Sequence, residues 1–265
     1  MARTTSLTWG QYTRFLKEWA QGYIKGHSYW TIESRPVCAI NNLADFVTKY
    51  GHATFAVMVR YARRVMQKEL GVDPYILGVI GEANPRNVRL TNSLQVDAIT
   101  GYGLLPNWLG NPIQKYEDLI SERVRDWESI QRRIRVPFYP VVCSGWDATV
   151  RGAFRGELRA EDGYPHSPIV TSATPALFGY FIDRAIAFNL RWQPRHNIVF
   201  LHAWNEWSES SVIEPSDRFG SALLDEVKQR ALGISPMVSP GLRAAFAEEN
   251  AGDCYGFGRR TSLIE

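Results

Sequence analysis

Short apolar runs alternate with longer amphipathic segments along most of the chain. The apolar runs have the length of buried strands and cover residues 36–41, 74–80, 95–99, 138–143 and 197–203. In the segments between them, apolar residues recur every three or four positions, as on one face of a helix. This spacing predicts helices over residues 9–26, 44–70, 115–134, 174–190 and 219–232, the second with a break near Gly51. Apolar strands separated by helices indicate a parallel α/β sheet with helices outside it.

Three residues at element boundaries add detail to these predictions. Asn42 is expected to cap the helix that follows the first strand. Thr174, followed by Pro175, has the pattern of an N-cap and a first helical residue. Pro140 lies inside the fourth strand and weakens it, because proline has no backbone N–H to donate.

Charge and cysteine content exclude several classes of protein. Thirty Lys and Arg residues against 27 Asp and Glu residues give a net charge of +3, too weak and dispersed to indicate nucleic-acid binding. No apolar run approaches the roughly 18 residues of a membrane span, and the first ten residues lack a signal-peptide core, so a cytoplasmic location is expected. Cys38, Cys143 and Cys254 are far apart, which argues against a disulfide framework and a metal site. No cofactor motif is found, so no cofactor is expected.

The clearest candidate for chemistry follows the fifth predicted strand, where residues 203–209 are Ala-Trp-Asn-Glu-Trp-Ser-Glu. Ligands of parallel α/β folds bind at the carboxyl ends of strands. Glu206 and Glu209 are three residues apart, which in a helical turn brings side chains within roughly 5–6 Å. Two carboxyl groups in different surroundings, one protonated and one ionised, are what glycosidic bond cleavage requires. Trp204 precedes the pair and Trp207 lies between its two members, and both are suited to stack on a sugar. The alternative is a solvated loop whose indoles pack on helices.

Two blocks of sequence resemble a known family. Residues 200–220 contain W-N-E-W-x-E followed by I-E-P, a pattern similar to that of the WbsX-type polysaccharide-biosynthesis proteins. That group is in turn similar to glycoside hydrolase family 99, the endo-mannosidase family. Ser210 stands where the family motif has Gly. Residues 145–151 resemble the family's G-W-D-N-T-P-R, with Ala148 and Val150 in place of Asn and Pro. Together with a weaker match that starts at residue 29, the resemblance spans about residues 29–232.

The resemblance implies an α/β fold that is a partial (β/α)8 TIM-type barrel, with about five parallel strands and outer helices. Residues 1–233 are expected to form this C-terminal portion of the barrel, and residues 234–265 a peripheral tail. The family's first three strands are not found here, which implies that a missing N-terminal segment or a partner chain completes the barrel. The resemblance also implies that Glu206 is a base and Glu209 an acid/base. In the hydrolase branch the base deprotonates the sugar 2-hydroxyl, which attacks the anomeric carbon and gives an epoxide.

Other residues at strand ends are candidates for binding a glycan or sugar substrate. Asp147 is interpreted as a ligand of a sugar hydroxyl that Arg151 holds in place, or else as the partner of Arg151 in a structural ion pair. Tyr102 is expected to bond the sugar or a catalytic carboxylate, with a capping aromatic as the alternative. Glu214 is expected to fix the loop behind the acids through backbone hydrogen bonds, and His202 to be buried and hydrogen-bonded. The full predicted substrate-binding set is Trp146, Asp147, Arg151, Tyr102, Trp204, Asn205 and Trp207.

Three functions fit these features. The favoured one is a glycoside hydrolase-like enzyme that acts on α-linked, mannose-type glycans or a cell-surface polysaccharide through Glu206 and Glu209. The first alternative is a glycosyltransferase of polysaccharide or O-antigen biosynthesis, although no DxD-like motif for a metal-bound phosphate stands at a strand end. The second is a non-catalytic carbohydrate-binding remnant, because strands of the barrel are missing.

Overall fold

The computed structural model describes residues 8–25, 28–81, 91–103, 105–152, 156 and 159–232. The predicted tail, residues 234–265, lies outside these residues, as does Cys254. Within the described part of the chain, no helix combines the length and the apolar character needed to cross a membrane.

A parallel sheet whose strands follow one another in chain order forms the centre of the fold. The strands are β2 (Arg35–Ile40), β3 (Tyr75–Ile80), β4 (Ala98–Gly101), β6 (Phe138–Tyr139), β7 (Val141–Cys143) and β9 (Phe200–His202). The pairs β2–β3, β3–β4, β4–β6 and β7–β9 are all parallel. A short strand, β1 (Thr31–Ile32), pairs antiparallel with the start of β2. The predicted α/β class, with five parallel strands, is therefore confirmed.

Pro140 divides the fourth predicted strand into β6 and β7, as its missing N–H suggests. Its carbonyl oxygen still accepts a hydrogen bond from the backbone N–H of Phe200 at 2.9 Å. The sheet therefore continues across the proline, with β6 paired to β4 and β7 paired to β9.

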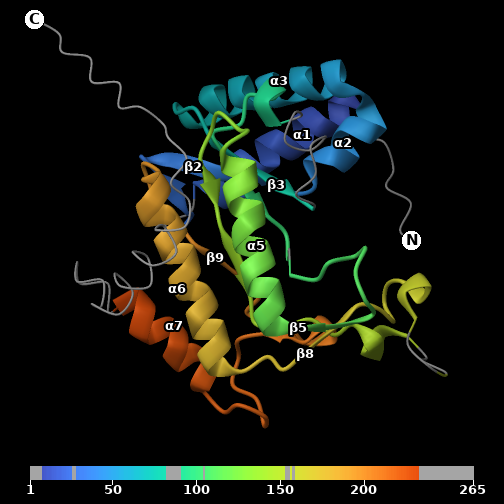
Figure 1. Cartoon of the computed structure of the whole chain (residues 1–265). Helices are drawn as coiled ribbons and strands as arrows, with labels where there is room; N and C mark the ends of the chain where they lie inside the picture. Colours follow the sequence, from blue (N-terminus) through green and yellow to red (C-terminus); the bar gives the residue numbers. More distant parts are fainter. Residues whose placement is uncertain are drawn as a thin grey trace, which may run out of the picture.

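Helices cover the outside of the sheet in two groups (Figure 1). One group comprises α1 (Trp9–Trp19), its π-helical continuation η1 (Ala20–Ile24), α2 (Leu43–Tyr50) and α3 (His52–Leu70). The other comprises α5 (Tyr116–Gln131), α6 (Pro175–Trp192) and α7 (Ala222–Leu232), with α6 in contact with both its neighbours. In Figure 1, α5 and α6 run side by side along the front of the sheet.

The helix boundaries confirm some expected caps and correct one. The Thr174 hydroxyl accepts a hydrogen bond from the backbone N–H of Leu177 at 3.2 Å, so Thr174 is an N-cap. Gly51 separates α2 from α3 with a φ of 77°, a value that glycine adopts without steric cost. Asn42 makes no capping bond: it is left-handed, with a φ of 50°, and its side chain donates to Asp45 Oδ2 at 2.7 Å instead. The last helix also starts later than predicted, at Ala222 rather than at residue 219.

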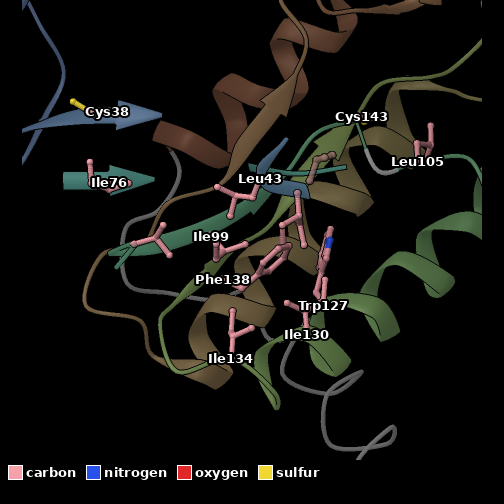
Figure 2. Packing of buried hydrophobic residues seen from close by; sticks show 14 of the residues in the cluster. Cys38, Leu43, Ile76, Ile99, Leu105, Trp127, Ile130, Ile134, Phe138 and Cys143 are labelled. Carbon is pink, nitrogen blue, oxygen red and sulfur yellow. The ribbon is translucent and has the colours of Figure 1, made fainter. Parts of the chain in front are cut away.

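The sheet has apolar side chains on both faces, which explains its near-continuous apolar runs. Figure 2 shows the outer face, where Ile99 and Phe138 meet Trp127 and Ile130 of α5. The inner face carries a separate buried cluster formed by Ile32, Val37, Tyr75, Leu77, Ala98 and Tyr139. The fold therefore rests on two apolar layers, with the larger one under the helices.

An ionic network ties the amino ends of three strands together, at the end of the sheet opposite the predicted site. Arg35 and Arg63 both pair with Asp73 and with Asp97, at distances between 2.6 and 2.9 Å. Asp97 also accepts a hydrogen bond from the Ile76 backbone N–H at 2.7 Å. These ion pairs hold the amino ends of the strands together, beside the apolar cluster of the inner face.

Several short elements at the carboxyl ends of the strands were not predicted. They are β5 (Ile113–Lys115), β8 (Ile169–Thr171), β10 (Asn205–Glu206), β11 (Ser211–Val212) and the single turns η2 (Thr149–Arg151), η3 (Ala160–Asp162) and η4 (Trp207–Glu209). β5 and β8 pair in parallel, and β10 and β11 form an antiparallel hairpin. Elements of two or three residues have no periodicity that a sequence pattern reveals.

Candidate active site

A hairpin after β9 presents the two glutamates. In this hairpin Glu206 on β10 is opposite Ser211 on β11. The connecting turn, η4, ends at Ser210, which is left-handed with a φ of 52° and a ψ of 24°. Glycine adopts this conformation most easily, and the resembling motif has glycine here. Ser210 therefore preserves the backbone of the turn although it departs from the motif.

The guanidinium group of Arg151, at the end of η2, joins the two carboxyl groups. Its Nη2 donates to Glu206 Oε1 and its Nη1 to Glu209 Oε1, both at 2.8 Å. The Ser208 hydroxyl donates to Glu206 Oε1 at 2.5 Å and accepts from Arg151 Nε at 2.8 Å. The Tyr164 hydroxyl accepts from Arg151 Nη1 and donates to Glu209 Oε1 at 3.4 Å. The five side chains form one hydrogen-bonded cluster.

Glu206 is placed to be ionised. The hydrogen bond from Ser208 lowers the pKa of its carboxyl group, and the positive charge of Arg151 lowers it further. About a third of its side chain remains exposed, so water also solvates the charge. Glu206 is therefore a carboxylate at neutral pH.

Glu209 is in the opposite situation. Only 6% of the residue is exposed, and its Oε2 has no hydrogen-bond partner among the described residues. Burial raises the pKa of this carboxyl group, the charge of Glu206 adds to the effect, and Arg151 and Tyr164 oppose it. The two neighbouring carboxyl groups thus have pKa values shifted in opposite directions.

Asp147 has partners that differ from those predicted. Its Oδ1 accepts hydrogen bonds from the Thr149 backbone N–H at 3.0 Å and from the Thr149 hydroxyl at 2.7 Å. Its backbone N–H donates to the Glu209 carbonyl oxygen at 2.8 Å. The predicted contact between Asp147 and Arg151 is therefore wrong, because Arg151 is engaged by the two glutamates. Asp147 instead joins its own loop to the loop of Glu209.

Exposed aromatic rings surround the carboxyl groups. Trp204 is 55% exposed, and Trp207 and Tyr102 are each 50% exposed. The Trp207 indole N–H donates to Glu214 Oε2 at 2.8 Å, and the Glu214 backbone N–H donates to the Trp204 carbonyl oxygen at 3.1 Å. Glu214 thus holds the loop through its side chain as well as through its backbone. Asn205 lies beside Glu206 on β10 and is also exposed.

Trp146 is buried beside the site, so little of its indole surface is available to a ligand. It is 6% exposed and packs edge-to-face against Trp108, with ring centroids 5.6 Å apart. Trp108 itself is 43% exposed and its ring lies 6.4 Å from that of Tyr164. Trp146 was predicted to bind substrate, and its burial leads us to expect that the exposed ring of Trp108 offers a surface to the ligand instead.

His202 is buried at the end of β9, as predicted. Its Nδ1 lies 3.0 Å from the Ser211 hydroxyl, and its ring is edge-to-face with that of Tyr102, with centroids 5.0 Å apart. Burial lowers the pKa of the imidazole, although the charge of Glu206 opposes this. Among the described residues, no group of three His, Cys, Asp or Glu side chains is placed to hold a metal ion.

Sequence reasoning missed three residues of this site: Trp108, Tyr164 and Ser208. Trp108 lies in the loop that follows β4, so attention to the whole loop after each strand would have found it. Ser208 lies between the two glutamates, where a hydroxyl within the motif was a visible signal. Tyr164 lies in a long loop away from any strand end, and no pattern in the sequence pointed to it.

Comparisons with known proteins agree with this fold. The sequence model of the family described as "Glycosyltransferase WbsX" matches residues 8–227. A curated relative described as "Uncharacterized protein WxcX", from Xanthomonas campestris pv. campestris strain ATCC 33913, is 37% identical over 126 residues, which are 45% of this chain and 16% of the relative. The corresponding protein of strain B100 is 37% identical over 120 residues, 44% of this chain and 15% of its own length. The chain thus spans only a small part of these relatives.

Two solved structures similar to this chain are of the GH99 endo-alpha-mannosidase from Bacteroides thetaiotaomicron. The complex of that enzyme with bis-tris-propane aligns over 90% of this chain and 67% of its own, with a TM-score of 0.53 and 12% identity. A second structure of it has a TM-score of 0.50 and 11% identity, over 92% of this chain and 65% of its own. At this identity the likeness concerns the fold, and it agrees with a sheet that is part of a (β/α) barrel. Because the family match covers most of the chain, the protein belongs to the Glycosyltransferase WbsX family.

Proposed function

We propose that this protein cleaves α-linked, mannose-type glycosidic bonds, with Glu206 as the base and Glu209 as the acid. The observation that carries the proposal is the cluster in which Arg151 joins two carboxyl groups whose pKa values are shifted in opposite directions. An ionised and a protonated carboxyl group side by side are the pair that glycosidic cleavage needs.

Each glutamate has a definite proton to move in this reaction. Ionised Glu206 takes the proton of the sugar 2-hydroxyl, whose oxygen then attacks the anomeric carbon and forms the 1,2-epoxide. Protonated Glu209 gives its proton to the departing glycosidic oxygen as that bond breaks. Glu209, now ionised, takes a proton from the incoming hydroxyl as it opens the epoxide, and Glu206 returns its proton to the sugar. This route has two displacements and retains the configuration of the anomeric carbon.

The identity of the incoming hydroxyl separates hydrolysis from transfer. If water is the incoming group, the protein is a hydrolase. If a sugar hydroxyl is the incoming group, the protein is a transferase, and the family description "Glycosyltransferase WbsX" favours this alternative. The similar fold of an endo-α-mannosidase favours hydrolysis. Analysis of the products with and without an added acceptor sugar distinguishes the two, because only a transferase makes a longer glycan.

Substitution of either glutamate tests the assignment. We expect Glu206→Gln and Glu209→Gln to fold normally, because the amide keeps the shape of the side chain. Each is expected to lower kcat/KM on an alkyl α-mannoside by about 10²–10⁴-fold, the usual contribution of general acid–base catalysis. A dinitrophenyl α-mannoside should partly restore Glu209→Gln only, because its leaving group needs no proton.

Glu117→Gln, at an exposed position of α5, is the matched control and should be fully active. Equal rescue of both active-site variants by the good leaving group would contradict the division of roles. Full activity in either variant would exclude the glycosidase proposal. A parent protein that binds sugar but turns over neither substrate would favour a non-catalytic carbohydrate-binding function.

A further inference from the structure

The imidazole of His202 lies between three elements of the site, although no step of the proposed reaction uses it. Its Nδ1 is bonded to Ser211 on β11, and its ring packs against Tyr102. A Cβ atom placed on Gly103 would lie 3.2 Å from Cε1 and 3.3 Å from Nε2 of His202. The ring is therefore held on several sides, and its orientation is set by the fold.

The hydrogen bonds of Ser211 determine which nitrogen of His202 carries the proton. The Ser211 hydroxyl donates to the His202 carbonyl oxygen at 2.8 Å, which uses its only hydrogen. The contact between Ser211 Oγ and His202 Nδ1, at 3.0 Å, can then form only if Nδ1 carries a hydrogen. This arrangement favours the Nδ1–H tautomer of neutral His202, in which Nε2 has a free lone pair.

The free Nε2 lies close to Gly103, in the loop that follows the carboxyl end of β4. It makes no hydrogen bond to any of the residues that the structure describes, and Gly103 beside it has no side chain to offer one. His202 keeps 9% of its surface exposed, and Tyr102, which packs on it, is half exposed. An acceptor nitrogen in this position calls for a donor from outside the protein.

We propose that His202 binds substrate, with Nε2 accepting a hydrogen bond from one hydroxyl group of the sugar beside Glu206. The inference rests on the proposed function and deepens it. A neutral imidazole with a fixed tautomer accepts a hydrogen bond but cannot donate one at Nε2, so it distinguishes a free hydroxyl from a deoxy or O-methyl position. His202 thereby determines which sugars fit, whereas the two glutamates carry out the chemistry.

The tautomer is measured directly by ¹⁵N NMR of the imidazole nitrogens in the whole protein. We expect Nδ1 of His202 to carry the proton and Nε2 to be of the unprotonated type, with His196, which pairs with Glu33 far from the site, as the internal comparison. Ser211→Ala should remove the preference, because nothing then holds the proton on Nδ1. An Nε2–H tautomer in the parent protein would overturn the inference without any measurement of activity.

Binding is tested with methyl α-mannoside and its monodeoxy analogues. We expect methyl α-mannoside to shift the Nε2 signal of His202, and one deoxy analogue to bind about three- to tenfold more weakly than the parent sugar. In His202→Asn, which keeps a donor toward Ser211 but loses the group at Nε2, that difference should disappear. In His202→Gln, whose amide oxygen reaches the position of Nε2, part of it should return.

Tryptophan fluorescence reports sugar binding separately, so the two proposals fail differently. The inference about His202 is wrong, and the proposed function stands, if the sugar binds without shifting the Nε2 signal of the parent protein. The same conclusion follows if the parent and His202→Asn discriminate equally between methyl α-mannoside and its deoxy analogues. If no sugar of the panel binds to the parent protein, the proposed function and this inference are both contradicted.

Discussion

Arg151 is the residue on which the charges of the site depend. Its guanidinium bonds both carboxyl groups, and its positive charge lowers the pKa of Glu206 and of Glu209. For Glu206 this adds to the hydrogen bond from Ser208, and for Glu209 it only offsets part of the effect of burial. The same cation therefore favours the ionised form of both carboxyl groups.

Removal of this charge should move the pH profile of activity. In the proposed reaction, the acid limb of kcat/KM reports the ionisation of Glu206, and the alkaline limb reports the loss of the proton from Glu209. In Arg151→Gln both pKa values rise, because an opposite charge that favoured each carboxylate is gone. We therefore expect both limbs to lie at higher pH than in the parent protein.

The measurement is kcat/KM against pH on an aryl α-mannoside. Arg132→Gln is the control, because Arg132 is 60% exposed and pairs with Glu128 on α5, away from the site. Limbs that stay in place, or that move to lower pH, would show that Arg151 does not set the ionisation of the pair.

At the scale of elements, the site depends on how closely the loop after β7 approaches the β10–β11 hairpin. The Ser144 hydroxyl donates to the Val212 carbonyl oxygen at 3.0 Å. The Asp147 backbone N–H donates to the Glu209 carbonyl oxygen at 2.8 Å. Between these two bonds, a Cβ atom on Gly145 would lie 2.9 Å from the Ser210 carbonyl oxygen. The absence of a side chain at Gly145 lets the two loops meet.

Gly145→Ala should therefore displace the hairpin that carries the glutamates. The contact is with backbone, which cannot rotate away, so overpacking is expected to lower the free energy of unfolding by about 1–3 kcal/mol. A shift near 1 Å in catalytic groups costs about 10²-fold in rate, and kcat/KM should fall by up to this factor. Urea unfolding and kinetics of the same preparation measure both effects.

Gly22→Ala is the matched control. A Cβ atom at Gly22, in the helical segment η1, meets nothing within 4 Å. Alanine there should leave activity unchanged and raise the free energy of unfolding by up to about 1 kcal/mol. An active and fully stable Gly145→Ala variant would mean that the close approach of the loops is not required.

On the scale of the whole molecule, the parallel sheet has an open edge at β2 among the residues that the structure describes. Residues Cys38–Ile40 pair with β3 on one side, while on the other side β1 pairs only with Arg35 and Pro36. In α1 and η1, which precede β1 and β2 in the chain, Phe15 and Tyr23 lie about two helical turns apart and are 51% and 72% exposed. An open strand edge and exposed aromatic side chains are both surfaces that a further βα unit would cover.

We expect three further βα units to complete the barrel at this edge. Phe15→Gln with Tyr23→Gln should change the free energy of unfolding of the present chain by less than about 0.5 kcal/mol, as is usual for exposed positions. In a polypeptide in which three βα units precede residue 8, the same two substitutions should lower the free energy of unfolding by about 1.5–3 kcal/mol for each ring, because both rings are then buried. Denaturant unfolding of the present chain and of the longer polypeptide, each with and without the two substitutions, measures the difference. Equal effects in both would argue against burial of Phe15 and Tyr23.

The sequence by itself determined the features that depend on neighbours in the chain. The alternation of apolar runs and helical periods identified the parallel strands and their order, and Thr174 and Gly51 marked helix ends as the structure has them. The pair Glu206 and Glu209 was found because a motif after a strand is local. These features are governed by backbone preferences and by burial of whole faces, both of which repeat along the chain.

Only the tertiary structure decided which side chains meet across loops. Arg151 is 55 residues from Glu206 and 58 from Glu209 in the chain. It pairs with these two glutamates and not with nearby Asp147 because η2 packs against η4. Tyr164 joins the cluster from a loop without any periodic pattern. The opposite pKa shifts of the two glutamates likewise come from contacts made in the folded chain, namely the hydrogen bond from Ser208 to Glu206 and the burial of Glu209. Loop conformations and desolvation come from the packing of the whole chain, and no short stretch of sequence contains them.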